Sequence, residues 1–200
     1  VAKAAAALNL DYVVITSPTR DDLDDGGAGI FSQTVRSIIS LDCKRRVEIL
    51  IPDFSGNIDS IKKVVDSQPK VIAHNLETGP SLYAQVRQGS DYKRSLKVLK
   101  TIKEIDKGIY TKSGLMLGLG EKRAEVIRVF KDLRKVDCDF LTLGQYLAPS
   151  LHHFPVKQYI SPEVFDDYKE QAFSLGFKSV ASSAYVRSSY RASEFFNDSK

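Results

Sequence analysis

Short apolar runs rich in β-branched residues alternate along the chain with longer segments in which apolar residues recur every three or four positions. The runs are typical of buried parallel strands, and the segments between them are typical of amphipathic helices. Glycine or proline follows most of the runs and predicts a turn there. We therefore predict five strands, and a further short one near the end, at residues 11–17, 47–54, 71–77, 112–120, 140–147 and 178–185.

The segments between the strands carry the apolar stripe of a helix. Ser161 and Pro162 predict the start of the last long helix, with serine at the N-cap and proline in the first turn, and Gly176 predicts its end. Residues 1–10 are rich in alanine and have no N-cap, so we expect the chain to begin inside a helix, as a fragment would. The stripes consist of Phe31, Val35, Ile38 and Ile39; Ile58, Ile61, Val64 and Val65; Tyr92, Leu96, Leu99 and Ile102; Ala124, Ile127, Phe130 and Leu133; and Val164, Phe165, Tyr168 and Ala172.

Strands that alternate with helices require parallel crossovers, so the predicted fold class is α/β. Such a sheet is either an open doubly wound sheet or a partial barrel. Barrel enzymes assemble their sites from the ends of many strands, whereas an open sheet places its ligand at one switch point. A barrel is favoured because polar residues follow nearly every strand, namely Arg20, Asp21 and Asp22; Asp53; His74, Asn75 and Glu77; Glu121; and Gln145, His152 and His153.

Composition narrows the possible functions. With 42% apolar and 27% charged residues, the chain has the composition of an ordinary globular protein. The net charge is +4, and lysine and arginine are scattered instead of forming a basic stripe, so we expect no nucleic-acid binding. No apolar run approaches the ~18 residues of a membrane span, so we expect no membrane association. Cys43 and Cys138 have no C-x-x-C spacing, which predicts two structural thiols in a reducing compartment.

Two polar clusters follow predicted strands. The acidic residues 21–25 before Gly26 and Gly27 form either a solvated turn or a rim that orients a cationic group, and the turn is favoured. His74, Asn75 and Glu77 end a buried strand, which tolerates them only if they are satisfied or point into a site. A functional role is slightly favoured for this second cluster.

Other signals are weaker. Gly118 and Gly120 predict a tight turn with exposed backbone amides, but they lack the spacing of a dinucleotide fingerprint or a Walker loop. Adjacent His152 and His153 face opposite ways on an extended segment, so a surface or substrate-loop role is favoured over metal binding. Lys112 could form a Schiff base inside a barrel, although an ordinary exposed lysine is expected. No histidine base lies near residues 187–190, which argues against a hydrolase nucleophile there.

Several stretches of the chain are similar to the lipoyl synthases, a family of radical S-adenosylmethionine enzymes. They run in the family's order over nearly the whole sequence. The matching stretches are residues 12–28 (with YVVITS, RDDL and DGGA), 47–54 (VEILIPDF), 74–78 (HNLET), 112–121 (KSGLMLGLGE), 139–147 (DFLTLGQYL), 152–153 (HH) and 186–190 (VRSSY).

The resemblance implies a partial (β/α)6 TIM-type barrel over residues 1–192, with its first strand missing. The polar composition of residues 193–200 predicts a frayed tail. The resemblance implies S-adenosylmethionine and two [4Fe-4S] clusters as cofactors. One cluster would cleave S-adenosylmethionine to a 5′-deoxyadenosyl radical, which abstracts hydrogens from C6 and C8 of an octanoyl chain bound to a lysine. The auxiliary cluster would supply the two sulfur atoms.

The resemblance also implies the partners. They are an octanoylated lipoyl-carrier domain, either the E2 component of 2-oxoacid dehydrogenases or the glycine cleavage H protein, and an electron donor such as ferredoxin or flavodoxin. The expected location is the bacterial cytoplasm, with the mitochondrial matrix as the alternative.

Individual residues take roles from the same resemblance. Ser189 corresponds to a serine that ligates the auxiliary cluster, and Arg187 is expected to brace its segment. The implied S-adenosylmethionine contacts are Asn75, Glu77 and Glu121, with Asp22, Gly26 and Gly27 on the same rim.

The chain departs from the family in its cysteines. Three cysteines in a C-x-x-x-C-x-x-C loop and three further N-terminal cysteines are absent, and Cys43 and Cys138 lie in segments that do not correspond to them. We therefore expect a C-terminal fragment that alone binds no stable radical cluster and is inactive. Two alternatives stay open, a non-catalytic barrel that binds a nucleoside or carrier protein, and a barrel aldolase or isomerase that uses Lys112 as a Schiff-base amine.

Overall fold

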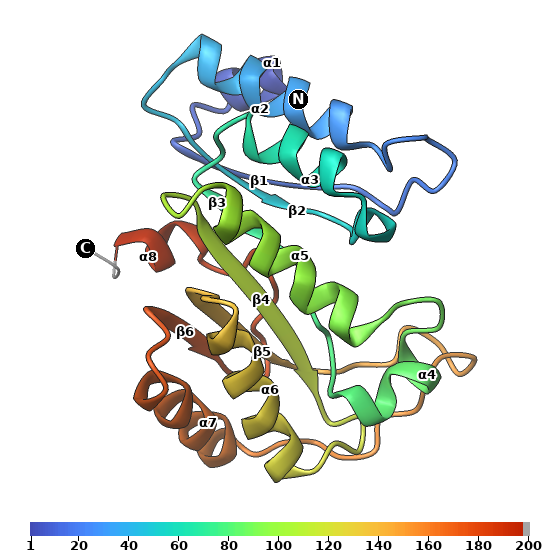
Figure 1. The fold of residues 1–200 in the computed structure, drawn as a ribbon. Helices are drawn as coiled ribbons and strands as arrows, with labels where there is room; N and C mark the ends of the chain where they lie inside the picture. The colour runs from blue at the N-terminus through green and yellow to red at the C-terminus, as the bar shows by residue number, and fades with distance from the viewer. Residues whose placement is uncertain (198–200) are drawn as a thin grey trace.

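The computed structural model describes residues 1–197 and is organised around a single parallel sheet (Figure 1). Its six strands lie side by side in chain order, and each neighbouring pair is parallel. β1 and β6 each pair with one neighbour, so the sheet is an open, partial barrel. The strands are β1 (Tyr12–Thr16), β2 (Arg46–Leu50), β3 (Val71–Ala73), β4 (Tyr110–Leu117), β5 (Phe140–Gln145) and β6 (Ser179–Ser182).

One long helix follows each of the first five strands and covers the outer face of the sheet (Figure 1). These helices are α2 (Ala28–Leu41), α3 (Ile58–Val65), α5 (Tyr92–Ile105), α6 (Arg123–Lys135) and α7 (Pro162–Ser174). The shorter elements are α1 (Ala2–Ala7), η1 (Phe54–Gly56), η2 (Pro80–Leu82), α4 (Tyr83–Val86) and α8 (Ala192–Asn197).

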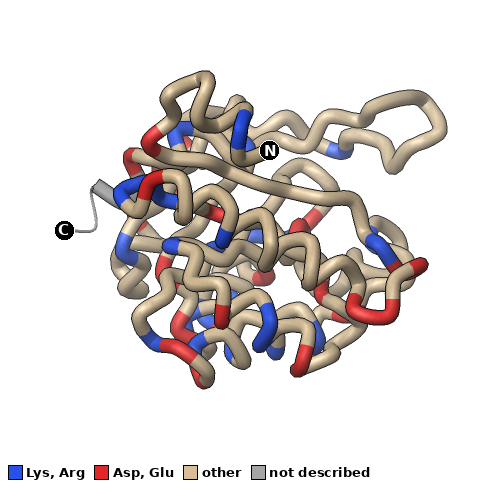
Figure 2. Tube along the Cα trace, turned by 90° about the horizontal axis from the view of Figure 1, so that it is seen from above, with Lys and Arg blue, Asp and Glu red and all other residues tan. Residues whose placement is uncertain are grey.

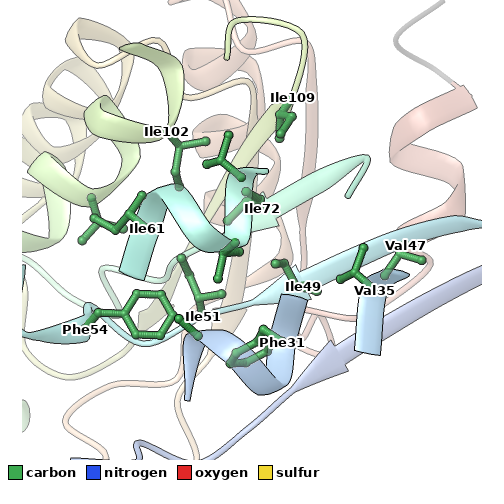
Figure 3. Packing of buried hydrophobic residues seen from close by; sticks show 14 of the residues in the cluster. Phe31, Val35, Val47, Ile49, Ile51, Phe54, Ile61, Ile72, Ile102 and Ile109 are labelled. Carbon is green, nitrogen blue, oxygen red and sulfur yellow. The ribbon is translucent and has the colours of Figure 1, made fainter. Parts of the chain in front are cut away.

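The main core lies between the sheet and these helices. In the first half of the chain, Phe31 and Val35 of α2 pack with Ile49 of β2 and Ile61 of α3 (Figure 3). In the second half, Leu115 and Leu117 of β4 join a cluster that includes Phe130 of α6 and Phe165 of α7. Each fully buried side chain of this size stabilises the fold by about 1.5–3 kcal/mol, so this layer fixes the positions of the strands.

The inner face of the sheet has a different character. Alternate residues of a strand face opposite sides, so β4 sends Leu115 and Leu117 outward and Gly114 and Met116 inward. At the amino end of the inner face, Val71 and Phe140 form a small apolar cluster with Tyr110, whose ring stacks on that of Phe140 at 5.0 Å. The carboxyl end of the inner face is open.

The predicted fold class and all six predicted strands are confirmed. The third strand is shorter than predicted, because after Ala73 the chain leaves the ladder and reaches Glu77 with a left-handed φ of 64°. Helix α8 includes residues 193–197, which we expected to be frayed, while residues 198–200 of the predicted tail lie outside the described residues.

Ser161 occupies the N-cap of α7, as predicted, but its side chain makes no capping hydrogen bond. A hydrogen bond from Ser161 instead lowers the pKa of Glu163. The end of the same helix is as predicted, because Gly176 has a φ of 93°, a conformation that glycine adopts without strain.

Charged residues of both signs are interspersed along the trace (Figure 2). Among residues 1–197, no helix combines the length and the apolar character needed to cross a bilayer.

The outer core generates a stability prediction. Phe130 is fully buried and its ring meets those of Tyr168 and Phe177 edge to face. Phe130→Ala is expected to lower the free energy of unfolding by about 3–5 kcal/mol. Phe173→Ala, on an α7 side chain that is 45% exposed, should cost about 1 kcal/mol or less. Urea denaturation measures both, and equal losses would contradict the assigned core.

Candidate active site at the carboxyl edge of the sheet

Two cavities adjoin at the carboxyl ends of the strands. The first, of about 390 Å³, lies among the segments that follow β1, β2 and β3 and the loop at residues 87–90. The second, of about 220 Å³, lies over the ends of β4 and β5. Asn75 and Glu77 line both cavities and therefore form their shared wall.

The shared wall is held rigidly. Glu77 donates its backbone N–H to Gly114 at 2.9 Å and accepts from the N–H of Met116 at 2.7 Å. These bonds to β4 fix Glu77 in a left-handed conformation that is uncommon for a non-glycine residue. Strained residues of this kind cluster at ligand sites, where the surrounding structure maintains them.

One polar atom of this wall has no partner. The side-chain N–H of Asn75 donates to Glu77 Oε1 at 3.1 Å, but Asn75 Oδ1 is buried and makes no hydrogen bond among the described residues. A buried oxygen without a donor costs free energy unless a ligand or water supplies one. Asn75 Oδ1 is therefore a ready acceptor for a bound molecule.

Two glycines near this acceptor allow other segments to approach β4 and β5 closely. A Cβ at Gly114 would lie 2.6 Å from Thr142 Oγ1 and 3.0 Å from Asn75 Oδ1. A Cβ at Gly144 would lie 2.2 Å from the carbonyl oxygen of Val186. Both glycines line the second cavity, so any larger side chain would fill its floor or displace its wall.

The Glu77 carboxyl group titrates abnormally. Burial raises its pKa, and the hydrogen bond from Asn75 and the positive charge of Arg87 oppose that rise. A carboxyl group in this position can accept hydrogen bonds from a cationic or hydroxyl-bearing ligand, which would stabilise its ionised form.

His74 lies behind the first cavity and is only 2% exposed. Its Nδ1 is 2.9 Å from the carbonyl oxygen of Ile51, which can only accept, so Nδ1 carries the proton. Burial lowers the pKa of His74 to about 4, and the ring is neutral near pH 7. Its Nε2 is buried without a partner and is a second free acceptor.

Two arginines line the first cavity, together with the carboxylates of Asp21, Asp53 and Glu77. Arg94 Nε donates to Asp53 Oδ2 at 2.6 Å, and Arg87 Nη1 donates to the carbonyl oxygen of Asn75 at 3.1 Å. Guanidinium groups bind carboxylates and phosphates well. Neither arginine is predicted from the sequence, because both lie away from the strand ends and reach the cavity only through the tertiary fold.

Only Asp21 of the acidic turn lines the first cavity, and the other described residues of the turn lie outside both cavities. Asp22 is exposed and pairs with Arg20 at 2.5 Å. Gly26 and Gly27 have φ values of 60° and 88°, and Gly27 is the N-cap of α2. Neither these glycines nor Asp22 line the two adjoining cavities. Asp25 accepts from the N–H groups of Gly27 and Gly29 and pairs with Lys63, which agrees with the favoured reading as a turn.

Glu121 lies outside both cavities as well. Its carboxylate accepts hydrogen bonds from the backbone N–H groups of Gly118 and Leu119 at 2.7 and 2.8 Å. The prediction of exposed amides in this tight turn is therefore wrong, because Glu121 caps them.

The segment at residues 186–190 borders the second cavity. Arg187 lines that cavity, and its Nη1 donates to the carbonyl oxygens of Val186 and Ala184 at 2.7 and 3.2 Å. Ser189 is exposed, and its hydroxyl group has no hydrogen-bond partner among the described residues. Asn75, Glu77 and Arg187 thus meet at one site, with Ser189 beside it.

Lys112 is not the exposed lysine that we expected. It is 1% exposed and forms an ion pair with Glu48 at 2.8 Å. The inward phase of β4 places it there, and the pairing argues against a Schiff-base role. His152 and His153 are exposed, as favoured above, and the ring of His153 contacts Ser150 Oγ.

The described residues contain no group of three or more histidine, cysteine or carboxylate side chains placed to hold a metal. Cys43 is exposed, and Cys138 is buried, with burial and Asp139 raising the pKa of its thiol to about 12. The polar groups that line the adjoining cavities can bind a polar organic ligand.

His74 generates a pH prediction. Its pKa is about 4 in the folded protein against 6.5 ordinarily, so the unfolded chain binds more protons between those values. The ring's contribution to stability is complete above pH 6.5 and is lost as the pH falls toward 4. His74→Gln, which can still donate to Ile51, should remove up to about 3 kcal/mol of this pH dependence.

Urea denaturation between pH 4 and 7 measures the effect. His153→Gln, at an exposed histidine, is the matched control and should keep the wild-type slope. A wild-type slope in His74→Gln would show that this ring does not titrate as the structure indicates.

Comparison with known proteins agrees with the geometry. Residues 1–133 match the model of the radical SAM superfamily. The chain is 56% identical over 194 residues to lipoyl synthase from Caldicellulosiruptor saccharolyticus, covering 97% of this chain and 68% of that protein. It is 57% identical over 194 residues to lipoyl synthase from Alkaliphilus metalliredigens, covering 97% and 67%. It thus spans about two thirds of the length of these relatives.

Solved structures share the fold at low identity. A methylornithine synthase superimposes with a TM-score of 0.64 at 13% identity, covering 90% of this chain and 59% of that one. A domain of a pyruvate-formate lyase-activating enzyme from Bacteroides vulgatus gives 0.62 at 10% identity, covering 84% and 98%. The superfamily match and the extent of identity together show that this chain belongs to the lipoyl synthase family of the radical SAM superfamily.

Proposed function

We propose that the two adjoining cavities bind S-adenosylmethionine and the octanoyl chain side by side, in an enzyme that inserts two sulfur atoms at C6 and C8 of that chain. The observation that carries the proposal is the rigid shared wall, in which Asn75 Oδ1 is buried and lacks a donor. Sulfur insertion requires that the radical source and the carbon chain be neighbours, and a common wall brings two ligands to that distance.

The first cavity matches the polar groups of S-adenosylmethionine. Asn75 Oδ1 and the Glu77 carboxylate would accept hydrogen bonds from its ammonium and ribose hydroxyl groups. Arg87 and Arg94, which line the same cavity, would attract its carboxylate. Bound S-adenosylmethionine and its iron–sulfur cluster supply the radical chemistry, while these side chains bind and orient.

The second cavity matches an aliphatic chain. Met116, Leu147 and Val186 contribute to its lining. An apolar wall binds methylene groups and excludes water from the reacting carbons. Gly114 and Gly144 let Asn75, Thr142 and the backbone of Val186 approach the sheet closely, so that these residues form the wall around the chain.

We further propose two [4Fe-4S] clusters, with Ser189 as a ligand of the auxiliary one. The described residues do not form a cluster site on their own, since they bring together no thiolate set. The cysteine ligands would come from other parts of the protein, which agrees with the chain spanning about two thirds of its relatives.

The proposed partners follow from the family. The carrier would be the lipoyl domain of a 2-oxoacid dehydrogenase E2 component or the glycine cleavage H protein, and a ferredoxin or flavodoxin would supply electrons. We place the protein in the bacterial cytoplasm, and the bacterial origin of the relatives supports this over the mitochondrial matrix.

Binding of S-adenosylmethionine tests the site. In the full-length protein with reconstituted clusters, Asn75→Ala and Glu77→Gln should each raise the dissociation constant about 10- to 100-fold, because each removes a hydrogen bond to a charged or polar ligand group. Asp22→Asn is the matched control and should bind as wild type, because Asp22 lies outside both cavities. Isothermal titration calorimetry measures all three.

The opposite ranking would contradict the assignment. If Asp22→Asn weakened binding while Asn75→Ala and Glu77→Gln did not, the ligand would bind on the acidic turn, and the shared wall would have another role.

A further inference from the structure

Lys112 lies on the inner face of β4, beneath the second cavity. It precedes Gly114 by two residues and Met116 by four, so all three face the same side of the strand, and the latter two line that cavity. A lysine with 1% of its surface exposed requires an explanation, because burying its charge is costly unless the charge is paired.

The pairing extends across three strands. Lys112 Nζ donates to Glu48 Oε1 at 2.8 Å, and the Tyr12 hydroxyl donates to Glu48 Oε2 at 2.6 Å. The side chains of Lys112 and Glu48 are 1% and 2% exposed. Such a pair is weak evidence for stability, because the cost of desolvating both charges offsets their attraction. The second hydrogen bond of the ammonium group is therefore more informative about the role of Lys112.

Lys112 Nζ also donates to the backbone carbonyl oxygen of Ser188 at 2.7 Å. Ser188 is 76 residues further along the chain and lies outside the strands. The same segment is anchored at Val186, which is buried and passes so close to β5 that Gly144 has no room for a Cβ. Two fixed points thus define the path of residues 186–188.

Ser189 follows directly after the second fixed point. Its side chain is exposed, and its hydroxyl group has no hydrogen-bond partner within the part of the chain that the structure describes. The backbone of Ser188 is fixed by a hydrogen bond, and the hydroxyl group of the next residue, Ser189, remains available. This arrangement can orient the Ser189 oxygen as a ligand.

We propose that Lys112, itself held by Glu48 and Tyr12, is a positioning residue that fixes Ser189 for ligation of the auxiliary cluster. The inference rests on the proposed role of Ser189 and deepens it. Lys112 acts through the Ser188 carbonyl group and lines neither of the two cavities.

The test uses the full-length protein with reconstituted clusters. Lys112→Met alone would leave Glu48 buried without its cation, so the informative variant is the double change Glu48→Gln with Lys112→Met. Glutamine still accepts from Tyr12, and no charge is left unpaired. Hydrogen exchange measured on peptides covering residues 185–191 reports the order of the segment, and Mössbauer spectroscopy reports the ligands of the auxiliary cluster.

A second buried lysine provides the matched control. Lys103 pairs with Asp139 at 2.5 Å, at the amino end of β5, and Asp139 keeps a second partner in Lys178. Lys103 lies on α5, so Lys103→Met removes another buried, ion-paired lysine without touching residues 186–190.

In the double variant, residues 185–191 should exchange at least about tenfold faster, while β4 and β5 keep wild-type exchange. The auxiliary-cluster spectrum should move to that of Ser189→Ala. Lys103→Met should leave both readouts at wild type. Wild-type exchange and a wild-type spectrum in the double variant would overturn the inference. Faster exchange of residues 185–191 with an unchanged auxiliary-cluster spectrum would also overturn it. Faster exchange that extends over β4 and β5 would do the same, because the change would then be global.

Ser189→Ala separates the two proposals. If it changes the spectrum and the double variant does not, Ser189 remains a ligand and the positioning role of Lys112 is wrong. If it leaves the wild-type spectrum, the ligand role itself is wrong, whatever the exchange shows.

Discussion

The alternation of side chains along parallel strands is the constraint on which the rest of this structure depends. Each strand sends one set of residues outward against the helices and the other set to the inner face. The outward set supplies the main apolar core, and the inner face adds only a small apolar cluster at the amino ends of the strands. The rest of the inner face therefore carries the buried pair of Glu48 and Lys112, two glycines that allow close approach of neighbouring segments, and the walls of the cavities.

The site lies where the third strand stops early. Because β3 ends at Ala73, the next residues cross over the carboxyl edge of the sheet, and their backbone is tied to β4 at Glu77. Without that tie, Glu77 would not keep its left-handed conformation. The same crossing buries His74 and leaves Asn75 Oδ1 without a donor. Strain and an unsatisfied acceptor occur together at the wall that two cavities share.

Much of this was predictable from the sequence, and the failures have physical causes. Apolar runs such as 47–54 predicted strands, because burial on both faces leaves a near-continuous apolar signature. Asn75 and Glu77 were predictable as site residues because they end such a run. Lys112 was misjudged, since its inward phase and its partner Glu48, 64 residues away, depend on tertiary register. Arg87 and Arg94 were missed for the same reason. Glu121 was expected to meet a ligand, but the structure places its carboxylate on the amides of its own turn.

The central claim is that the wall formed by Asn75 and Glu77 binds S-adenosylmethionine. A crystal structure of the full-length protein with S-adenosylmethionine tests it most directly. The account predicts that the ligand lies in the first cavity, with a donor group on Asn75 Oδ1 and its carboxylate near Arg87 or Arg94. A ligand bound beside Gly26 and the acidic turn, without contact to Asn75 or Glu77, would contradict it.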